Sequence, residues 1–224
     1  MGLDWTIIAE NWRLLLDGFV NTLKLAVLAI FFSFGLGLVA GALRLAQHPL
    51  LHYPAVIYVE VIRGVPLIMV IFWFYFVSPI IAGRPLDNFT SALIAFIVFE
   101  GAYLGEIVRA GIQSVPVGQI DASNATGLSQ TQAMRHIILP QAIRNMIPAL
   151  VTRFIILFMD TSLAYIIGFR ELTRVAKIIA EREFRAFEVF TFIAVVYFLC
   201  TYSMSFVSRR WEARLSAAKG AVPS

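Results

Sequence analysis

The chain alternates long apolar runs with short polar segments. Three runs, Leu25 to Leu43, Gly64 to Gly83 and Val189 to Ser208, contain 19 or 20 residues without Asp, Glu, Lys or Arg. A helix of about 20 apolar residues is as long as the hydrocarbon core of a bilayer is thick. In hydrocarbon the backbone polar groups must bond within the segment, and the runs lack the alternation of barrel strands. Each run is therefore predicted to be a transmembrane helix.

Two further stretches are apolar but carry isolated charges. The stretch from Asn88 to Gly105 is interrupted by Glu100, and the stretch from Asn145 to Phe169 by Arg153 and Asp160. With the three uncharged runs they predict about five transmembrane helices. The composition agrees, because 59% of the residues are hydrophobic and 14% are charged, whereas soluble domains carry roughly 25% charged residues. The predicted fold class is an all-α, polytopic integral membrane protein.

The two ends of the chain differ from its apolar centre. Trp5, Ile8 and Trp12 fall on one side of a helix, which predicts either a helix in the membrane interface or a solvated amphipathic arm over residues 1–18. No basic segment precedes the first apolar cluster, so we do not expect a signal peptide. Residues 211–224 are predicted to form a tail that is disordered from Ala217 onward. One transmembrane domain, residues 19–210, lies between the two ends.

Small residues recur in the first apolar run. Ser33, Gly37 and Gly41 are spaced four residues apart, so they share one face of a helix. Such a ladder lets two helix backbones approach closely. It predicts a packing surface, with a dedicated dimer interface as the alternative.

A polar segment from Asp121 to Pro140 has the signals of two short helices. Pro116 suits the start of the first helix, and Gly127 a position just past its end. The tetrapeptide Ser129–Gln132 has the spacing of a capping box at the start of the second. The second helix is predicted to extend to Leu139, because proline is poorly tolerated further inside a helix. Two helices that meet at the glycine would form a knob between membrane segments.

The sequence has no recognisable motif for ATP binding, metal binding or catalysis. No G-x-x-x-x-G-K-[ST] sequence is present, so ATP has no P-loop to bind. His48, His52 and His136 have no acidic partners at metal-ligand spacing, and Cys200 lies inside the last apolar run. We therefore expect no catalytic residue, no metal site and no bound cofactor.

The isolated charges inside the apolar stretches carry more information. A charge at a helix centre costs roughly 2.5 to 3.5 kcal/mol on insertion scales, so it needs a partner or water. Arg153 and Asp160 are seven residues apart and share one helix face. Two interpretations remain open. Glu100 and Arg153 form a structural ion pair, or Arg153 lines an aqueous path and binds a substrate carboxylate through its forked guanidinium.

The Asp121 to Pro140 segment resembles the EAA loop of ABC importer permeases. The family pattern has an acidic residue, two small residues, a glycine six positions after the acid, and I-x-L-P; Asp for Glu and Ser for Ala are departures from it. The resemblance implies a coupling loop, about residues 113–141, whose short helix docks on a cytoplasmic ATPase. The matching residues are Asp121, Ala122, Ser123, Gly127, Ile137, Leu139 and Pro140.

Three further blocks are similar to permeases of polar amino-acid ABC importers, namely Arg63–Leu67, Glu106–Ile112 and Asp160–Leu163. Two longer runs, 66–76 and 158–168, look most like the glutamate/aspartate branch, although Met159 stands where the family usually has lysine. With the isolated charges, these blocks give a candidate substrate path. It consists of Arg63, Glu100, Arg153, Asp160, Thr161 and Ser162.

The resemblance implies the type I ABC importer permease fold and a set of partners. Two permease subunits, identical or related, would form the path, a cytoplasmic ATPase dimer would use ATP, and an extracytoplasmic binding protein would deliver the amino acid. No nucleic-acid partner is implied. The expected cargo is glutamate or aspartate, with glutamine, arginine, histidine or cystine as alternatives. A secondary transporter is the other alternative, but the small number of spans without a visible repeat argues against it.

A cytoplasmic EAA-like loop sets the predicted topology. The amino terminus is then outside and the carboxyl terminus inside the bacterial cytoplasmic (inner) membrane. Most basic residues lie inside, as the positive-inside rule prefers. The last external loop is an exception. It carries Arg170, Arg174, Lys177, Arg182 and Arg185, nearly balanced by four glutamates.

Overall fold

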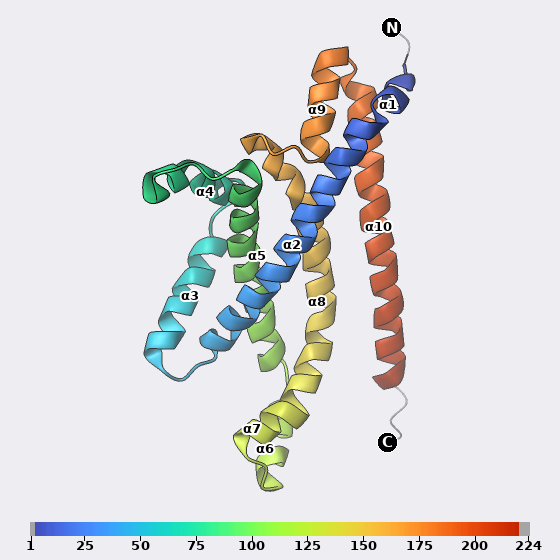
Figure 1. Cartoon of the computed structure of the whole chain (residues 1–224). Coiled ribbons are helices and arrows are strands. Elements are labelled where there is room, and N and C mark those ends of the chain that lie inside the picture. The colour runs from blue at the N-terminus through green and yellow to red at the C-terminus, as the bar shows by residue number, and fades with distance from the viewer. Residues whose placement is uncertain (1–2, 220–224) are drawn as a thin grey trace.

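The computed structural model describes the backbone of residues 3–219 and the side chains of residues 3–81 and 83–210. Every regular element in this range is helical (Figure 1). One π-helical segment, η1, and one 3-10 segment, η2, interrupt the α-helices. In chain order the elements are α1 Thr6–Glu10, α2 Trp12–Arg44, α3 Pro49–Arg63, α4 Leu67–Ala82, α5 Asn88–Gln113, α6 Val117–Ala125, α7 Gln130–Ala133, η1 Met134–Ile138, α8 Leu139–Asp160, η2 Thr161–Ile167, α9 Leu172–Glu183 and α10 Ala186–Lys219.

Four helical segments in the described chain are long and apolar enough to cross a membrane. They are α2, α5, the continuous run Gln130–Ile167 from α7 to η2, and Ala186–Arg210 within α10. The bent pair of α3 and α4 adds a fifth if it counts as one span. The long helices run lengthwise, with α6 and α7 at one end and α1 and α9 at the other (Figure 1). The all-α fold with about five spans is therefore confirmed.

The helix predicted from Gly64 to Gly83 is shorter than expected, Leu67–Ala82, and is not a span by itself. α3 ends at Arg63, α4 begins at Leu67, and the two helices are bent by 106°. The break coincides with Pro66, which has an extended backbone at the N-cap of α4. Proline has no N–H to continue the preceding helix, and it disfavours helical geometry at Val65. A run without charges therefore contains the corner between two helices.

The centre of the molecule is the contact between α2 and α5. A Cβ added to Gly37 would lie 2.5 Å from Cβ of Leu104, and one added to Gly41 would lie 2.7 Å from Cβ of Val108. The small-residue ladder is thus a packing surface within one chain. A core cluster of buried apolar side chains joins α2 and α5 to α4 and α8. These side chains include Leu25, Ile71, Phe96 and Leu157.

We expect Gly37→Leu to lower the melting temperature of the purified permease clearly, because overpacking a tight contact typically costs about 1–3 kcal/mol. Gly35→Leu is the matched control, since a Cβ on Gly35 has nothing within 4 Å. Thermal unfolding in detergent measures both variants. Equal melting temperatures for the two would contradict the assigned packing.

The chain ends differ in part from the expected boundaries. α2 begins at Trp12 and continues past residue 19, so the expected boundary between residues 18 and 19 falls inside a helix. At the other end α10 reaches Lys219, so the start of the expected tail is helical. Residues 220–224, the rest of that tail, lie outside the described residues.

The expected last external loop contains a helix. α9 packs its apolar face against α2 and α10 and buries Leu172, Val175 and Ile179. Hydropathy alone misses it, because its outer face carries the basic and acidic residues. Gly18 of α2 permits the close approach, since a Cβ there would lie 2.9 Å from Cγ2 of Val175.

Candidate functional site

The candidate coupling loop forms a knob at one end of the molecule (Figure 1). α6 follows Pro116 and ends at Ala125, and Gly127 has a φ of 76°. This left-handed conformation carries no steric penalty for glycine. The capping box is present, since Ser129 Oγ accepts from the Gln132 N–H at 3.3 Å and Gln132 Oε1 accepts from the Ser129 N–H at 2.9 Å. Local sequence signals thus correctly predict the turn between the two helices.

The second helix does not end at Leu139, contrary to the prediction. α7 continues through the π-helical segment Met134–Ile138 into α8, where Pro140 lies in the first turn. Proline removes one backbone donor and crowds the preceding turn. A π-helical segment just before it re-spaces the backbone hydrogen bonds. The loop is therefore joined to α8 by one helix that continues across the proline.

Asp121 does not cap α6. It lies in the middle of that helix with an exposed side chain, and the N-cap position is occupied by Pro116. Ser123 is buried, and its hydroxyl donates to the Ile120 carbonyl at 2.7 Å. The residues of the EAA-like pattern therefore differ in accessibility: Asp121, Ala122, Gly127, Leu139 and Pro140 are exposed, Ile137 is half-buried and Ser123 is buried.

The base of the knob is apolar. Val115, just before α6, packs with Ile138 at the end of η1 and with Ala142 and Met146 of α8. Asn145 Nδ2 also donates to Ser114 Oγ at 2.9 Å. The knob is thus anchored to the ends of both α5 and α8.

Glu100 of α5 and Arg153 of α8 form an ion pair in the apolar interior. Arg153 Nε and Nη2 donate to Glu100 Oε2 and Oε1, each at 2.6 Å, and Glu100 is fully buried. The guanidinium also lies over the ring of Tyr103, with 3.9 Å between Cζ and the ring centroid. The two helices are therefore linked by a bidentate, charge-assisted contact.

Asp160, at the end of α8, adds a second carboxylate to this region. It is half-buried and interacts electrostatically with both Arg153 and Glu100. In the part of the chain that the structure describes, it belongs to none of the ion pairs. When all three groups are ionised, two negative charges face one positive charge.

Thr161 and Ser162 are less accessible than their place in the candidate path suggests. Thr161 is fully buried, and its hydroxyl donates to the Phe158 carbonyl at 2.6 Å. Ser162 is half-buried. Arg153 and Asp160 are the charged residues among the candidate path residues on α8 and η2.

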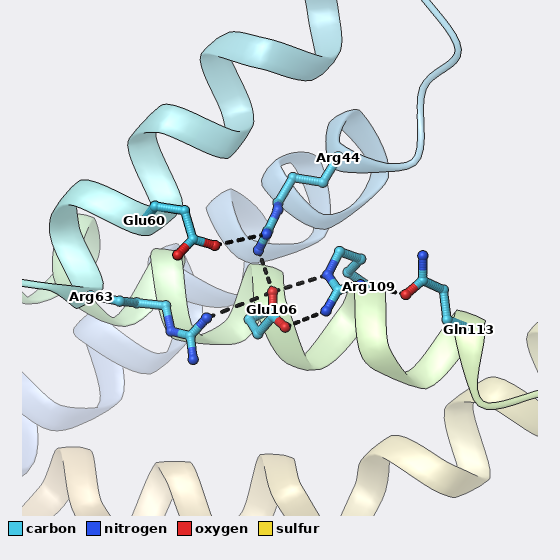
Figure 2. Close-up of polar contacts among 6 residues, drawn as sticks. All are labelled: Arg44, Glu60, Arg63, Glu106, Arg109 and Gln113. Atoms are coloured by element: carbon cyan, nitrogen blue, oxygen red, sulfur yellow. Dashed lines mark hydrogen bonds and ion pairs between the residues drawn. The ribbon is translucent and has the colours of Figure 1, made fainter.

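A second charged cluster lies where α2, α3 and α5 meet (Figure 2). Glu106 accepts hydrogen bonds from Arg44 and Arg109, and Arg63 Nη1 lies 3.7 Å from Glu106 Oε2. Arg44 Nη2 donates to Glu60 Oε1 at 3.0 Å. We name Arg44, Glu60, Arg63, Glu106 and Arg109 the junction cluster. It ties the ends of α2 and α3 to α5.

Arg63 thus lies in the junction cluster, and it also contacts Tyr103, with 5.4 Å between its Cζ and the ring centroid. No signal in the sequence predicts Arg44, Glu60 or Tyr103 as site residues. Glu106 and Arg109 do carry a local signal, because they lie three residues apart on one helix and form an ion pair.

The opposite end of the molecule holds a different polar contact. Glu171 caps α9, and its carboxylate accepts the backbone N–H groups of Thr173 and Arg174 at 2.7 and 2.6 Å. Burial raises the pKa of Glu171 to about 7, although these hydrogen bonds favour the carboxylate. The Leu172 N–H donates to Thr22 Oγ1 at 3.1 Å, which fixes the start of α9 on α2.

Comparisons with known proteins agree with this architecture. Residues 19–217 match the family described as the binding-protein-dependent transport system inner membrane component. The chain is 42% identical to the probable glutamine ABC transporter permease protein GlnP of Bacillus subtilis (strain 168), over 92% of this chain and 95% of the relative. It is 40% identical to the glutamate/aspartate import permease protein GltK of Escherichia coli O157:H7, over 90% and 93%.

Solved structures show the same fold. An amino acid ABC transporter crystallised with histidines superposes with a TM-score of 0.91 at 34% identity, and the match covers 96% of this chain and all of that one. The MetNI methionine ABC transporter superposes with a TM-score of 0.78 at 22% identity, over 92% and 98%, which supports the fold alone. The chain belongs to the family of binding-protein-dependent transport system inner membrane components, and it is a non-catalytic permease subunit of an ABC importer.

Proposed function

We propose that this permease moves a polar amino acid into the cell and that glutamate or aspartate is its cargo. As a member of its family it is a multi-pass inner membrane protein that binds no cofactor, and a partner ATPase hydrolyses the ATP. The relative GltK, named for glutamate/aspartate import, supports the acidic cargo. The resemblance in runs 66–76 and 158–168 points the same way.

The transport mechanism is inferred from the way the knob is connected to α5 and α8. α6 follows α5, which holds Glu100, and α7 leads through η1 into α8, which holds Arg153. A displacement of the knob by an ATPase would therefore act on both partners of the buried ion pair. We infer that this is how ATP hydrolysis changes access to the path formed by the candidate substrate residues.

The arrangement of the two ends supports the expected topology. The knob lies at one end of the molecule together with the end of α10, and α1 lies at the other end (Figure 1). If the knob contacts an ATPase in the cytoplasm, the carboxyl end of the chain is inside and the amino end is outside. The binding protein would then approach the end that carries α1 and α9. The second permease subunit, identical or related, would complete the path.

Glutamine is a second candidate cargo, favoured by the charges of the site. Glu100 already occupies the Arg153 guanidinium, and Asp160 adds another carboxylate nearby. An additional carboxylate on the cargo meets like charge in a region of low dielectric, whereas the glutamine side chain is neutral. The 42% identical relative is named as a glutamine permease.

Competition of uptake tests the cargo. Cells that depend on this permease and its own binding protein are given labelled glutamate or labelled glutamine, each with excess unlabelled glutamate, aspartate, glutamine, arginine or histidine. Acidic cargo predicts saturable glutamate uptake that aspartate inhibits. Saturable glutamine uptake that neither acid inhibits would replace the first candidate with the second. Absence of saturable uptake of both labelled glutamate and labelled glutamine would contradict both candidate cargoes.

A further inference from the structure

Tyr103 lies between two arginines from different helices. Its ring centroid is 3.9 Å from Cζ of Arg153 on α8 and 5.4 Å from Cζ of Arg63 at the end of α3. Tyr103 also lies three residues from Glu100 and three from Glu106, so these side chains follow one face of α5. The ring is therefore in contact with both the buried ion pair and the junction cluster.

Arg63 lies at the bend between α3 and α4. It is the last residue of α3, immediately before the corner of 106° that leads into α4. Its guanidinium reaches Glu106 at 3.7 Å as well as the Tyr103 ring. A change in the angle between α3 and α4 would move this guanidinium relative to the ring.

Arg153 has less freedom than an ordinary arginine. Two of its N–H groups face Glu100, while one face of its guanidinium lies on Tyr103. An aromatic face attracts a cation most strongly where water is excluded. Loss of the ring would leave Arg153 paired but free to tilt away from this orientation.

We propose that Tyr103 is a positioning residue for Arg153 and that its ring links the Arg153 guanidinium to Arg63 at the break between α3 and α4. A change in the angle between α3 and α4 then alters the orientation of Arg153 through the Tyr103 ring, without a direct contact between the two arginines. The inference rests on the proposed transport function, because it assigns Tyr103 to the conformational cycle of the same path.

Phe99 provides a matched comparison. Its ring contacts Arg153, with 5.7 Å between Cζ and the centroid, and it packs against Tyr103 at 5.1 Å between centroids. The cation–ring contacts of the described residues join Arg63 to Tyr103 and not to Phe99. Removing either aromatic ring disturbs packing, but only Tyr103→Leu removes the link between the arginines.

The test is a double-mutant cycle in proteoliposomes that contain the complete importer and its binding protein. Uptake KM and maximal rate are measured beside ATP hydrolysis for Tyr103→Leu, Arg63→Gln and the double variant. Each single variant is expected to reduce the amino acids imported per ATP by about threefold to tenfold. The double variant is expected to lose little more than the worse single variant. The same cycle with Phe99→Leu is expected to be additive.

Tyr103→Phe keeps the ring and is expected to recover most of the loss seen with Tyr103→Leu. Additive losses for Tyr103→Leu and Arg63→Gln, or equal losses for Phe and Leu at position 103, would overturn the inference. If Tyr103→Leu does not assemble, the cycle is run with Tyr103→Met, and the same outcomes apply. Normal uptake after neutralisation of both Glu100 and Arg153 would instead overturn the proposed path, so the two failures are distinguishable.

Discussion

Gly127→Leu is expected to reduce amino-acid uptake by about tenfold while the partner ATPase continues to hydrolyse ATP. Gly127 has a φ of 76°, and a left-handed backbone costs a residue with a Cβ roughly 1–2 kcal/mol. This strain corresponds to about a fivefold to thirtyfold shift in the population of the native turn. The knob would lose its shape, and movement of the ATPase would no longer reach α5 and α8. Paired assays of uptake and ATP hydrolysis in proteoliposomes measure the number of amino acids imported per ATP hydrolysed.

Gly127→Asn is the matched control, because asparagine tolerates the left-handed region far better than leucine. We expect it to retain most of the coupling. Normal uptake and normal ATPase association in Gly127→Leu would contradict the role of this turn. A loss that is equal for Asn and Leu would show that side-chain bulk at the surface, rather than backbone strain, is responsible.

Arg153→Gln is expected to abolish uptake and to lower the stability of the permease. The change leaves the fully buried Glu100 without its bidentate partner. Removing one partner of a buried ion pair typically costs about 3–5 kcal/mol. The yield of monodisperse protein in detergent, the melting temperature and the uptake rate measure the effect.

The double variant Glu100→Gln with Arg153→Gln separates structure from transport. Two amides can hydrogen-bond to one another without an unpaired charge, so we expect most of the stability to return. If the pair belongs to the substrate path, uptake stays at least tenfold below that of the unmodified permease. Full recovery of both stability and uptake would leave the ion pair with a structural role only.

Local signals in the sequence predict the knob well. The Ser129–Gln132 capping box and the left-handed glycine depend on residues within a few positions of one another, and both are present in the structure. Pro140 is the exception. Its effect depends on whether the helix before it can adopt a wider turn, and the segment Met134–Ile138 adopts π-helical geometry.

Contacts between helices are much harder to predict. The junction cluster joins Arg44, Glu60 and Glu106 from three helices, and no spacing in the sequence relates them. Tyr103 resembles any other aromatic residue of an apolar stretch until the positions of α3 and α8 are known. The pairing of Glu100 with Arg153 was one of two open interpretations, because burial makes a partner necessary but does not identify it.

Run length also has limits as a predictor of spans. The stretch from Gly64 to Gly83 has the length and composition of a transmembrane helix, but Pro66 divides it into a corner and a shorter helix. The amphipathic α9 was missed for the opposite reason, since its charged outer face hides a buried apolar face. Both differences arise from local geometry that an average of hydropathy does not record.

We propose that the knob couples this permease to ATP hydrolysis on a separate subunit. The most direct test is a cysteine at Ala122, on the exposed face of α6, cross-linked to the partner ATPase in the assembled importer. We predict that the cross-link forms in the membrane and that it stops ATP-driven uptake until a reductant cleaves it. If no exposed position of α6 forms the cross-link, or if uptake continues unchanged in the cross-linked complex, the knob does not have this coupling role.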